Sequence, residues 1–213
     1  MQLVFLGAPG AGKGTQAGWL SKEKGIPHIA TGDLLRSAVQ KKTGPGLAAA
    51  QYMNAGTLVP DSITLDVLKE RFAEQDTEKG YVLDGFPRNV TQAEALASML
   101  QISGWTLTRV IYFSLDEETL VKRISGRRIC PQCQAVYHLS ERPPRQEGRC
   151  DCGTLLIQRE DDTSETARVR FQVYQQETVP LVQYYTERHL LSAVNASAGV
   201  EEVMRQVKQA VGC

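Results

Sequence analysis

The stretch GAPGAGKGT, Gly7 to Thr15, decides the fold class of this sequence. It follows the apolar run LVFLG (3–7) and precedes a segment with helical periodicity. Its spacing fits G-x-x-x-x-G-K, ending at Gly12 and Lys13, with the expected hydroxyl delayed by one residue to Thr15. Such glycines let backbone N–H groups face a phosphate, beside a helix N-terminus and a lysine. We therefore predict a phosphate-binding strand–loop–helix unit, and prefer it to a glycine turn that only connects two elements.

Four more short, mostly apolar runs are spread along the chain. They are IPHIA (26–30), YVLDG (81–85), RVIYFSL (109–115) and LLSAVNA (190–196). Near-continuous apolar character is typical of parallel strands that are covered on both faces. Amphipathic segments separate these runs, and such alternation indicates an α/β fold with right-handed crossovers. The fold class predicted is therefore α/β, with a parallel sheet of the P-loop NTPase type.

Three of the helical segments carry specific expectations. Asp61 should cap a helix in DSITLDVLKERFAEQ, and Asp116 should cap another in DEETLVKRI. GVEEVMRQVKQAV should present Val200, Val203 and Val207 on one face. Residues 30–59, which are helical with a TGPG break, and residues 126–162 do not fit the alternation, so we expect both to be insertions at one edge of the sheet.

The bulk composition indicates a globular protein of ordinary solubility. The chain has 213 residues, 42% hydrophobic and 23% charged, with 24 basic and 24 acidic residues that balance. Zero net charge gives no support for a general binder of nucleic acid or of acidic membranes. No apolar run approaches the roughly 20 residues that span a bilayer. We expect a cytoplasmic protein, in which thiols stay reduced and paired cysteines favour a metal over disulfides.

Four of the five cysteines form two close pairs within 126–162. Cys130 and Cys133 have the C-x-x-C spacing of a zinc knuckle, and Cys150 and Cys152 follow as C-x-C. We predict a structural zinc site with Cys152 as fourth ligand. Asp151 as the fourth ligand and a metal-free, reduced-thiol segment remain alternatives. Cys213 is expected to be an incidental free thiol, and His138 is expected at the surface or next to the adenine, and not among the ligands.

Two further motifs hold polar side chains at the ends of predicted strands. In ATGDLLRSAV (30–39), Thr31 or Asp33 could cap a helix, with Arg36 one turn in. In YVLDGFPRNVTQ (81–92), Asp84 ends a strand on the side where the phosphate loop lies, a position that commonly holds Mg²⁺. A solvated arginine and a turn aspartate are the plainer interpretations of these two motifs.

Taken together, the motifs resemble those of the adenylate kinases, in particular the bacterial type with a long lid. GAPGAGKGTQ, TGDLLR, LVPD, LDGFPRN…Q, GRR and QREDD…R.R occur in the order of that family, up to about residue 196. The resemblance implies a five-stranded parallel core (1–29, 60–125 and 163–213), an AMP-binding insertion (30–59) and a lid (126–162), the latter two mobile. It implies reversible phosphoryl transfer from MgATP to AMP, giving two ADP.

The resemblance also implies roles for individual residues. The ATP-binding set is Gly10, Ala11, Gly12, Lys13, Gly14, Thr15, Arg123, Arg127, Val136 and Tyr137. The AMP-binding set is Thr31, Arg36, Thr57, Leu58, Val59, Gly85, Phe86, Pro87, Arg88, Gln92, Arg159 and Arg170. The catalytic set is Lys13, Asp84, Arg88, Arg127, Arg159, Asp161, Asp162 and Arg170, in which the two aspartates of REDD orient arginines. No catalytic base is required, because the acceptor is already an ionisable phosphate oxygen.

The sequence departs from the family in two places, and two other functions compete. The single residue between Cys150 and Cys152 is one fewer than usual, and NASAGVEE (195–202) lacks the usual lysine-containing turn. A UMP/CMP kinase is the nearest alternative enzyme, although Thr31 and Gln92 favour adenine. An ATP-controlled zinc module for nucleic acid or a protein partner is the alternative from another class, against which zero net charge argues. We expect a monomer that binds neither nucleic acid nor membranes.

Overall fold

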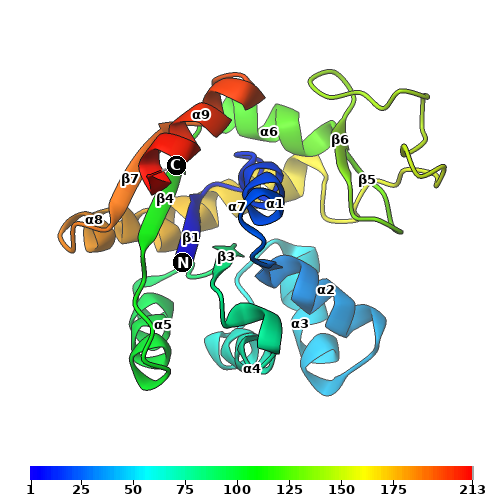
Figure 1. Ribbon diagram of the computed structural model, residues 1–213. Helices are drawn as coiled ribbons and strands as arrows, with labels where there is room; N and C mark the ends of the chain where they lie inside the picture. Colours follow the sequence, from blue (N-terminus) through cyan, green and yellow to red (C-terminus); the bar gives the residue numbers. More distant parts are fainter. Residues whose placement is uncertain (213) are drawn as a thin grey trace.

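The computed structural model of the chain describes residues 1–212 and places a parallel sheet at its centre (Figure 1). Within these residues, five strands pair in parallel in the order β2-β3-β1-β4-β7. Their bounds are β1 Gln2–Gly7, β2 His28–Ala30, β3 Tyr81–Asp84, β4 Arg109–Ser114 and β7 Leu191–Asn195. Each of the five strands overlaps one of the apolar runs singled out in the sequence, so the predicted α/β fold is confirmed.

The register brings the carboxyl ends of all the strands to one edge of the sheet. The central strand β1 pairs with β3, Gln2 opposite Tyr81, and with β4, Leu3 opposite Arg109. In an open parallel sheet, ligands bind outside this edge. The edge of this sheet carries Gly7, Ala30 and Asp84, each the last residue of its strand.

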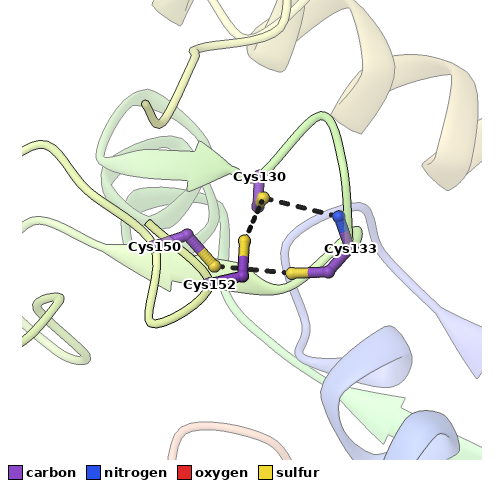
Figure 2. Close-up of side chains that lie close together, drawn as sticks. All are labelled: Cys130, Cys133, Cys150 and Cys152. Atoms are coloured by element: carbon purple, nitrogen blue, oxygen red, sulfur yellow. Dashed lines mark hydrogen bonds between the residues drawn. The ribbon is translucent and has the colours of Figure 1, made fainter. Parts of the chain in front are cut away.

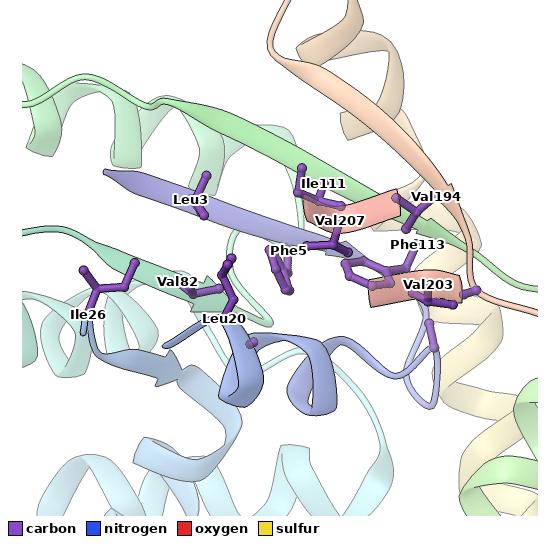
Figure 3. Close-up of a cluster of buried hydrophobic side chains, with 13 residues drawn as sticks. Leu3, Phe5, Leu20, Ile26, Val82, Ile111, Phe113, Val194, Val203 and Val207 are labelled. Carbon is purple, nitrogen blue, oxygen red and sulfur yellow. The ribbon is translucent and has the colours of Figure 1, made fainter. Parts of the chain in front are cut away.

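Helices cover both faces of the sheet, which is why the central strand β1 has buried apolar side chains on both faces. Leu3 and Phe5 face one side, where α1 (Lys13–Lys24) and α9 (Val200–Val211) pack (Figure 3). Val4 and Leu6 face the other side, where α4 (Asp61–Phe72), α5 (Val90–Ile102) and α8 (Pro180–Thr186) contribute to the cluster. Each large apolar side chain buried in this way stabilises the fold by about 1.5–3 kcal/mol.

Two segments project from the sheet on the same side of the molecule in Figure 1. One is the helix pair α2 (Thr31–Gln40) and α3 (Gly44–Ala55). The other lies between α6 (Glu117–Ser125) and α7 (Ser164–Val173) and holds the antiparallel hairpin of β5 (Arg127–Ile129) and β6 (Val136–His138). The chain also has two short helical segments, a 3₁₀ turn at Gln75–Thr77 and a π-helical turn at Tyr174–Thr178. No helix within residues 1–212 is both long enough and apolar enough to cross a membrane.

Three details of the helices differ from the sequence-based expectations. Asp61 is the first residue of α4 and Pro60 takes the N-cap position, so Asp61 is not the cap. Thr31 likewise begins α2 after Ala30, without a side-chain cap from Thr31 or Asp33. Val203 and Val207 are buried, but Val200 is 47% exposed because it lies at the first turn of α9, beyond the edge of the core. The Asp116 cap is confirmed, since its carboxylate accepts from the Thr119 backbone N–H at 2.8 Å.

Candidate active site

The phosphate loop leads directly from β1 into α1, as its sequence predicts. Gly12, at the N-cap position, has φ 84°, a left-handed conformation that a residue with a side chain adopts only under strain. The Lys13 ammonium folds back over the loop and donates to the backbone carbonyls of Gly7 and Ala8, each at 2.9 Å. Burial lowers the pKa of Lys13 from 10.5 to about 8, against the opposing attraction of Asp84. The loop thus holds a desolvated cation that lacks an anionic partner in contact.

Asp84 lies beside this loop at the end of β3. A side chain added at Gly14 would come within 3.4 Å of the Asp84 Oδ2 atom, so the carboxylate faces the start of α1. Burial by itself would raise the pKa of Asp84, but the hydrogen bond from His28 (3.3 Å) and the charges of Lys13 and Arg88 outweigh it and hold the pKa below its usual value. An ionised, largely buried carboxylate at this edge, 14% exposed, suits a Mg²⁺-bound nucleotide.

Thr31 and Arg88 meet at the turn that follows β3. The Thr31 hydroxyl and the Arg88 Nε atom both donate to the Gly85 carbonyl, at 2.9 and 2.8 Å. Phe86 is fully buried, and its peptide bond to Pro87 is cis. Burial lowers the pKa of Arg88, and repulsion from Arg36 adds to the effect. The turn therefore holds the Arg88 guanidinium close to that of Arg36, which comes from a different element.

Two carboxylates, those of Asp33 and Asp162, each contact two arginines of the site. Asp33 accepts from Arg36, on its own helix, and from Arg159 at 3.1 Å. Asp162, which is fully buried, accepts from Arg127 Nε at 2.7 Å and lies 3.8 Å from Arg170 Nη1.

The arginines of this group also repel one another. Burial lowers the pKa of Arg159 to about 10 and that of Arg170 to about 9, and neighbouring guanidinium groups contribute to both shifts. Asp161 pairs with Arg170 as well. The structure thus brings Arg36, Arg88, Arg127, Arg159 and Arg170 into one cationic cluster, with Asp161 and Asp162 in contact with its Arg127 and Arg170.

The residues expected near the adenine bases of ATP and AMP lie in different environments. Arg123 donates to the Ala196 carbonyl at 2.8 Å, after the last strand, and pairs with Glu141. Gln92 is buried, with its amide held by Asp61 and by the Arg88 backbone. Tyr137 turns its ring into the cysteine cluster, which leaves its backbone, together with Val136, for any contact with ATP.

Thr57, Leu58 and Val59 line a cleft of about 340 Å³. Asp61, Asn89 and residues of the α7–α8 region complete its wall. The three consecutive residues expected to contact AMP therefore line one cleft, next to helix α5, which carries Gln92.

The four cysteines of the projecting segment converge on one point (Figure 2). Their Sγ atoms all lie within 4.8 Å of one another, with 3.5 Å between Cys130 and Cys152 and 3.4 Å between Cys133 and Cys150. Asp151 does not join the thiol group, because its carboxylate faces Arg145 at 4.0 Å. The His138 ring accepts from the backbone of Ser140 and Glu141. Cys213 lies outside the described residues.

Three side chains in the site have roles that sequence reasoning did not foresee. Asp33 and Asp61 were expected only as helix caps, and His28 was not singled out. Only the i,i+3 spacing of Asp33 and Arg36 gave a local signal. Asp61 contacts Gln92 across 31 residues and His28 contacts Asp84 across 56, separations at which a single sequence gives no pairing signal.

This geometry defines a class of protein, the P-loop phosphotransferases, because a phosphate loop and a convergent arginine cluster share one edge of a parallel sheet. Residues 5–190 match the adenylate kinase family. An adenylate kinase from Caldicellulosiruptor bescii is 46% identical over 213 residues, which cover 100% of this chain and 99% of that protein. One from Archaeoglobus fulgidus is 48% identical over 209 residues, 98% of this chain and 96% of that protein. The chain belongs to the adenylate kinase family.

Membership in this family confirms the activity that the sequence predicted. The chain is an enzyme, an ATP:AMP phosphotransferase, and its reaction is the reversible transfer of a phosphoryl group from MgATP to AMP to give two ADP. Its substrates are accordingly ATP, AMP and ADP, and Mg²⁺ accompanies ATP.

Proposed function

We propose that the cationic cluster performs this transfer by positioning and by charge neutralisation, without a catalytic base. The observation that supports the proposal most directly is the convergence of Lys13 and the arginines: burial lowers the pKa of Lys13 and of Arg170, and neighbouring guanidinium groups lower both further. Partly buried cations that repel one another bind an anion strongly, because the anion removes the repulsion. Two phosphate chains meeting at this point supply that anion.

On the ATP side, the phosphate loop Gly10–Thr15 holds the phosphates, and Lys13 contacts the outer ones. Arg123 and the backbone of Val136 and Tyr137 flank the adenine. Mg²⁺ bound with ATP neutralises charge on the phosphates, and Asp84 is the residue that would hold it, through water.

On the AMP side, Arg36 and Arg88 hold the phosphate, and Thr31, the backbone of Thr57–Val59 and the Gln92 amide surround the base. A phosphate oxygen of AMP attacks the γ-phosphorus of ATP while the bond to the departing ADP oxygen breaks. Arg127, Arg159 and Arg170 face the charge that spreads over the transferred group. Asp161 and Asp162 fix the orientation of these guanidinium groups.

We propose that residues 126–162 form a lid and residues 30–59 an AMP-binding insertion, with 1–29, 60–125 and 163–213 as the core. Closure of both excludes water, which would otherwise accept the phosphoryl group. We also propose that the enzyme is a cytoplasmic monomer: one chain supplies both nucleotide sites, and reduced thiols suit that compartment.

The donor set of the cysteine cluster fits structural zinc. Tetrahedral Zn–S bonds of ~2.3 Å place the sulfurs roughly 3.8 Å apart. The pairs Cys130–Cys152 and Cys133–Cys150, at 3.5 and 3.4 Å, are slightly closer than this, and no pair exceeds 4.8 Å. We propose that Cys130, Cys133, Cys150 and Cys152 bind one Zn²⁺ that stabilises the lid. The bent C-x-C segment reaches the same point as the usual longer spacing.

The acceptor assignment is tested by ADP formation from ATP plus each nucleoside monophosphate, with and without Mg²⁺. AMP should give the highest kcat/KM, and omission of Mg²⁺ should abolish turnover. The Lys13→Ala protein, purified in the same way, measures any contaminating kinase. A higher kcat/KM for CMP or UMP than for AMP would show that the assignment of Thr31 and Gln92 to adenine binding is wrong.

A further inference from the structure

The Gln92 side chain is held between two partners of opposite and fixed polarity. Its Nε2 atom donates to Asp61 Oδ1 at 2.6 Å, and its Oε1 atom accepts from the Arg88 backbone N–H at 2.7 Å. An ionised carboxylate can only accept, and a backbone N–H can only donate. The orientation of this amide is therefore determined by its hydrogen-bond network.

Asp61 is itself fixed by a second amide. Asn89 caps α5 by accepting from the Gln92 backbone N–H at 2.8 Å, so its Nδ2 atom is turned toward Asp61 at 3.3 Å. Asp61 begins α4, where the helix N-terminus favours a negative charge. It also lines the cleft that Thr57, Leu58 and Val59 share. One carboxylate thus orients both amides from the wall of the site expected to bind AMP.

We propose that Asp61 is a specificity-determining positioning residue, which selects a 6-aminopurine over a 6-oxopurine by preventing rotation of the Gln92 amide. The inference rests on the proposed function, in which Gln92 contacts the base of AMP. Its Nε2 atom keeps one free N–H and its Oε1 atom one free lone pair. These match the N1 acceptor and the 6-amino donor of adenine, a pairing that an amide makes in bidentate fashion.

A 6-oxopurine presents the reverse order, a donor at N1 and an acceptor at position 6. To bind it, the amide would have to rotate by half a turn, placing Oε1 against the Asp61 carboxylate and Nε2 against the Arg88 N–H. Gln92 is only 2% exposed, so water cannot relieve either of these like-polarity contacts. Without rotation, the same two repulsive contacts arise between the amide and the base. Discrimination then comes from repulsion as well as from lost hydrogen bonds.

The wild-type enzyme tests the inference with three acceptors in steady-state assays: AMP, IMP and purine riboside 5′-monophosphate. The last compound keeps the N1 acceptor and has nothing at position 6. A fixed amide loses one contact with it but meets no repulsion, so we expect kcat/KM in the order AMP, purine ribotide, IMP. The purine ribotide should exceed IMP by about tenfold or more. If IMP equals or exceeds the purine ribotide, the amide rotates freely and the inference is wrong.

The Asp61→Asn variant tests the residue itself. The new amide can face either end of Gln92, so rotation then meets repulsion only from the Arg88 N–H. We expect the AMP-to-IMP ratio of kcat/KM to fall by about tenfold, the typical effect of one such contact, while the KM for ATP stays unchanged. Asp66→Asn on the exposed side of the same helix is the matched control and should keep the wild-type ratio.

Gln92→Ala separates this inference from the proposed function. If that variant loses the AMP preference while Asp61→Asn keeps it, Gln92 contacts the base and the role of Asp61 is wrong. If Gln92→Ala keeps the preference, the assignment of Gln92 itself fails. The ratio of two acceptors is measured on one protein sample, so partial unfolding of a variant does not change it.

Discussion

Lys13 shows how a single partly buried side chain links protonation to substrate binding. Its ammonium donates to the carbonyl oxygens of Gly7 and Ala8, and desolvation lowers its pKa to about 8. A bound phosphate favours the charged form and so raises this pKa. Near neutral pH the lysine is charged and ready to bind, whereas above pH 8 a growing fraction of the free protein holds it neutral.

The affinity for ATP should therefore fall as the pH rises above 8. The free protein must then take up a proton in order to bind, which costs up to about tenfold in affinity per pH unit until the pKa of the complex is reached. Calorimetric titrations of MgATP between pH 7 and pH 9.5 measure this slope. Lys13→Gln should bind more weakly and without that slope, and a flat wild-type profile would contradict the lowered pKa.

Replacing either of two central cations should slow the chemistry more than it harms the fold. Lys13→Ala and Arg88→Ala each remove one positioned donor, an effect that is typically roughly 10²–10³-fold in kcat. Steady-state kinetics together with circular dichroism measure both properties. Arg205→Ala, on the exposed face of α9 beside Glu202, is the control and should keep wild-type kcat. Near-normal turnover in Arg88→Ala would exclude that arginine from the site.

At the scale of elements, the proposed lid has little structural support of its own. Strands β5 and β6 are three residues each, and their buried cluster is limited to Cys130, Tyr137 and Cys150 with Ala135 and Leu156. A short two-stranded hairpin is marginally stable in water. A metal bound by four thiolates can supply the missing free energy, which makes the lid stiff enough to move as one body.

Cys130→Ser with Cys133→Ser should abolish zinc binding and lower the melting temperature. Activity at low temperature should largely persist, because none of the phosphate-binding cations is a ligand of the proposed metal. Elemental analysis, thermal melts and cold assays measure the three effects. Turnover that disappears on gentle chelation while the fold remains intact would make the metal catalytic.

The fourth ligand is identified by a pair of single variants. Cys152→Ser should weaken zinc binding more than Asp151→Asn, whose side chain faces Arg145. The opposite order would assign the fourth position to Asp151, and absence of zinc from carefully reduced wild-type protein would remove the site altogether.

At the scale of the whole molecule, an ion pair joins the two projecting segments across the active site. Arg159, from the proposed lid, contacts Asp33 of α2, 126 residues away in the sequence. Asp33 also pairs with Arg36, so both arginines now contact a carboxylate where the AMP phosphate is proposed to bind. Gly126 has a packing role at the lid boundary: a side chain there would clash with the His138 ring, at 2.2 Å from its Nε2 atom.

A bisubstrate analogue that joins ATP to AMP should protect residues 126–162 and 30–59 from proteolysis. Closure over both nucleotides buries these segments, and their backbone then resists cleavage. Limited digestion followed by mass spectrometry maps the protected sites. The Lys13→Ala protein at the same analogue concentration is the control and should be cleaved as readily as the free enzyme. Equal cleavage of wild-type protein with and without analogue would argue against closure.

The sequence by itself determined the sheet, the phosphate loop and the family. Short sequence patterns indicate these features: apolar runs indicate the strands and glycine spacing indicates the loop. Paired cysteines likewise indicate a thiol cluster. The five runs correspond to β1, β2, β3, β4 and β7, and Asp116 caps α6 as its position predicted. Local signals suffice here because backbone conformation and burial follow from neighbouring residues.

Only the tertiary structure decided which charges meet. Asp61 and Thr31 fit the pattern of helix caps, yet Asp61 holds Gln92 and Thr31 contacts Gly85. Val200 follows the helical period but lies beyond the core. A polar side chain that leaves water takes the partner that the fold brings near, and that partner can be far away in the chain. The contact between Asp33 and Arg159 exists for this reason, although 126 residues separate the two.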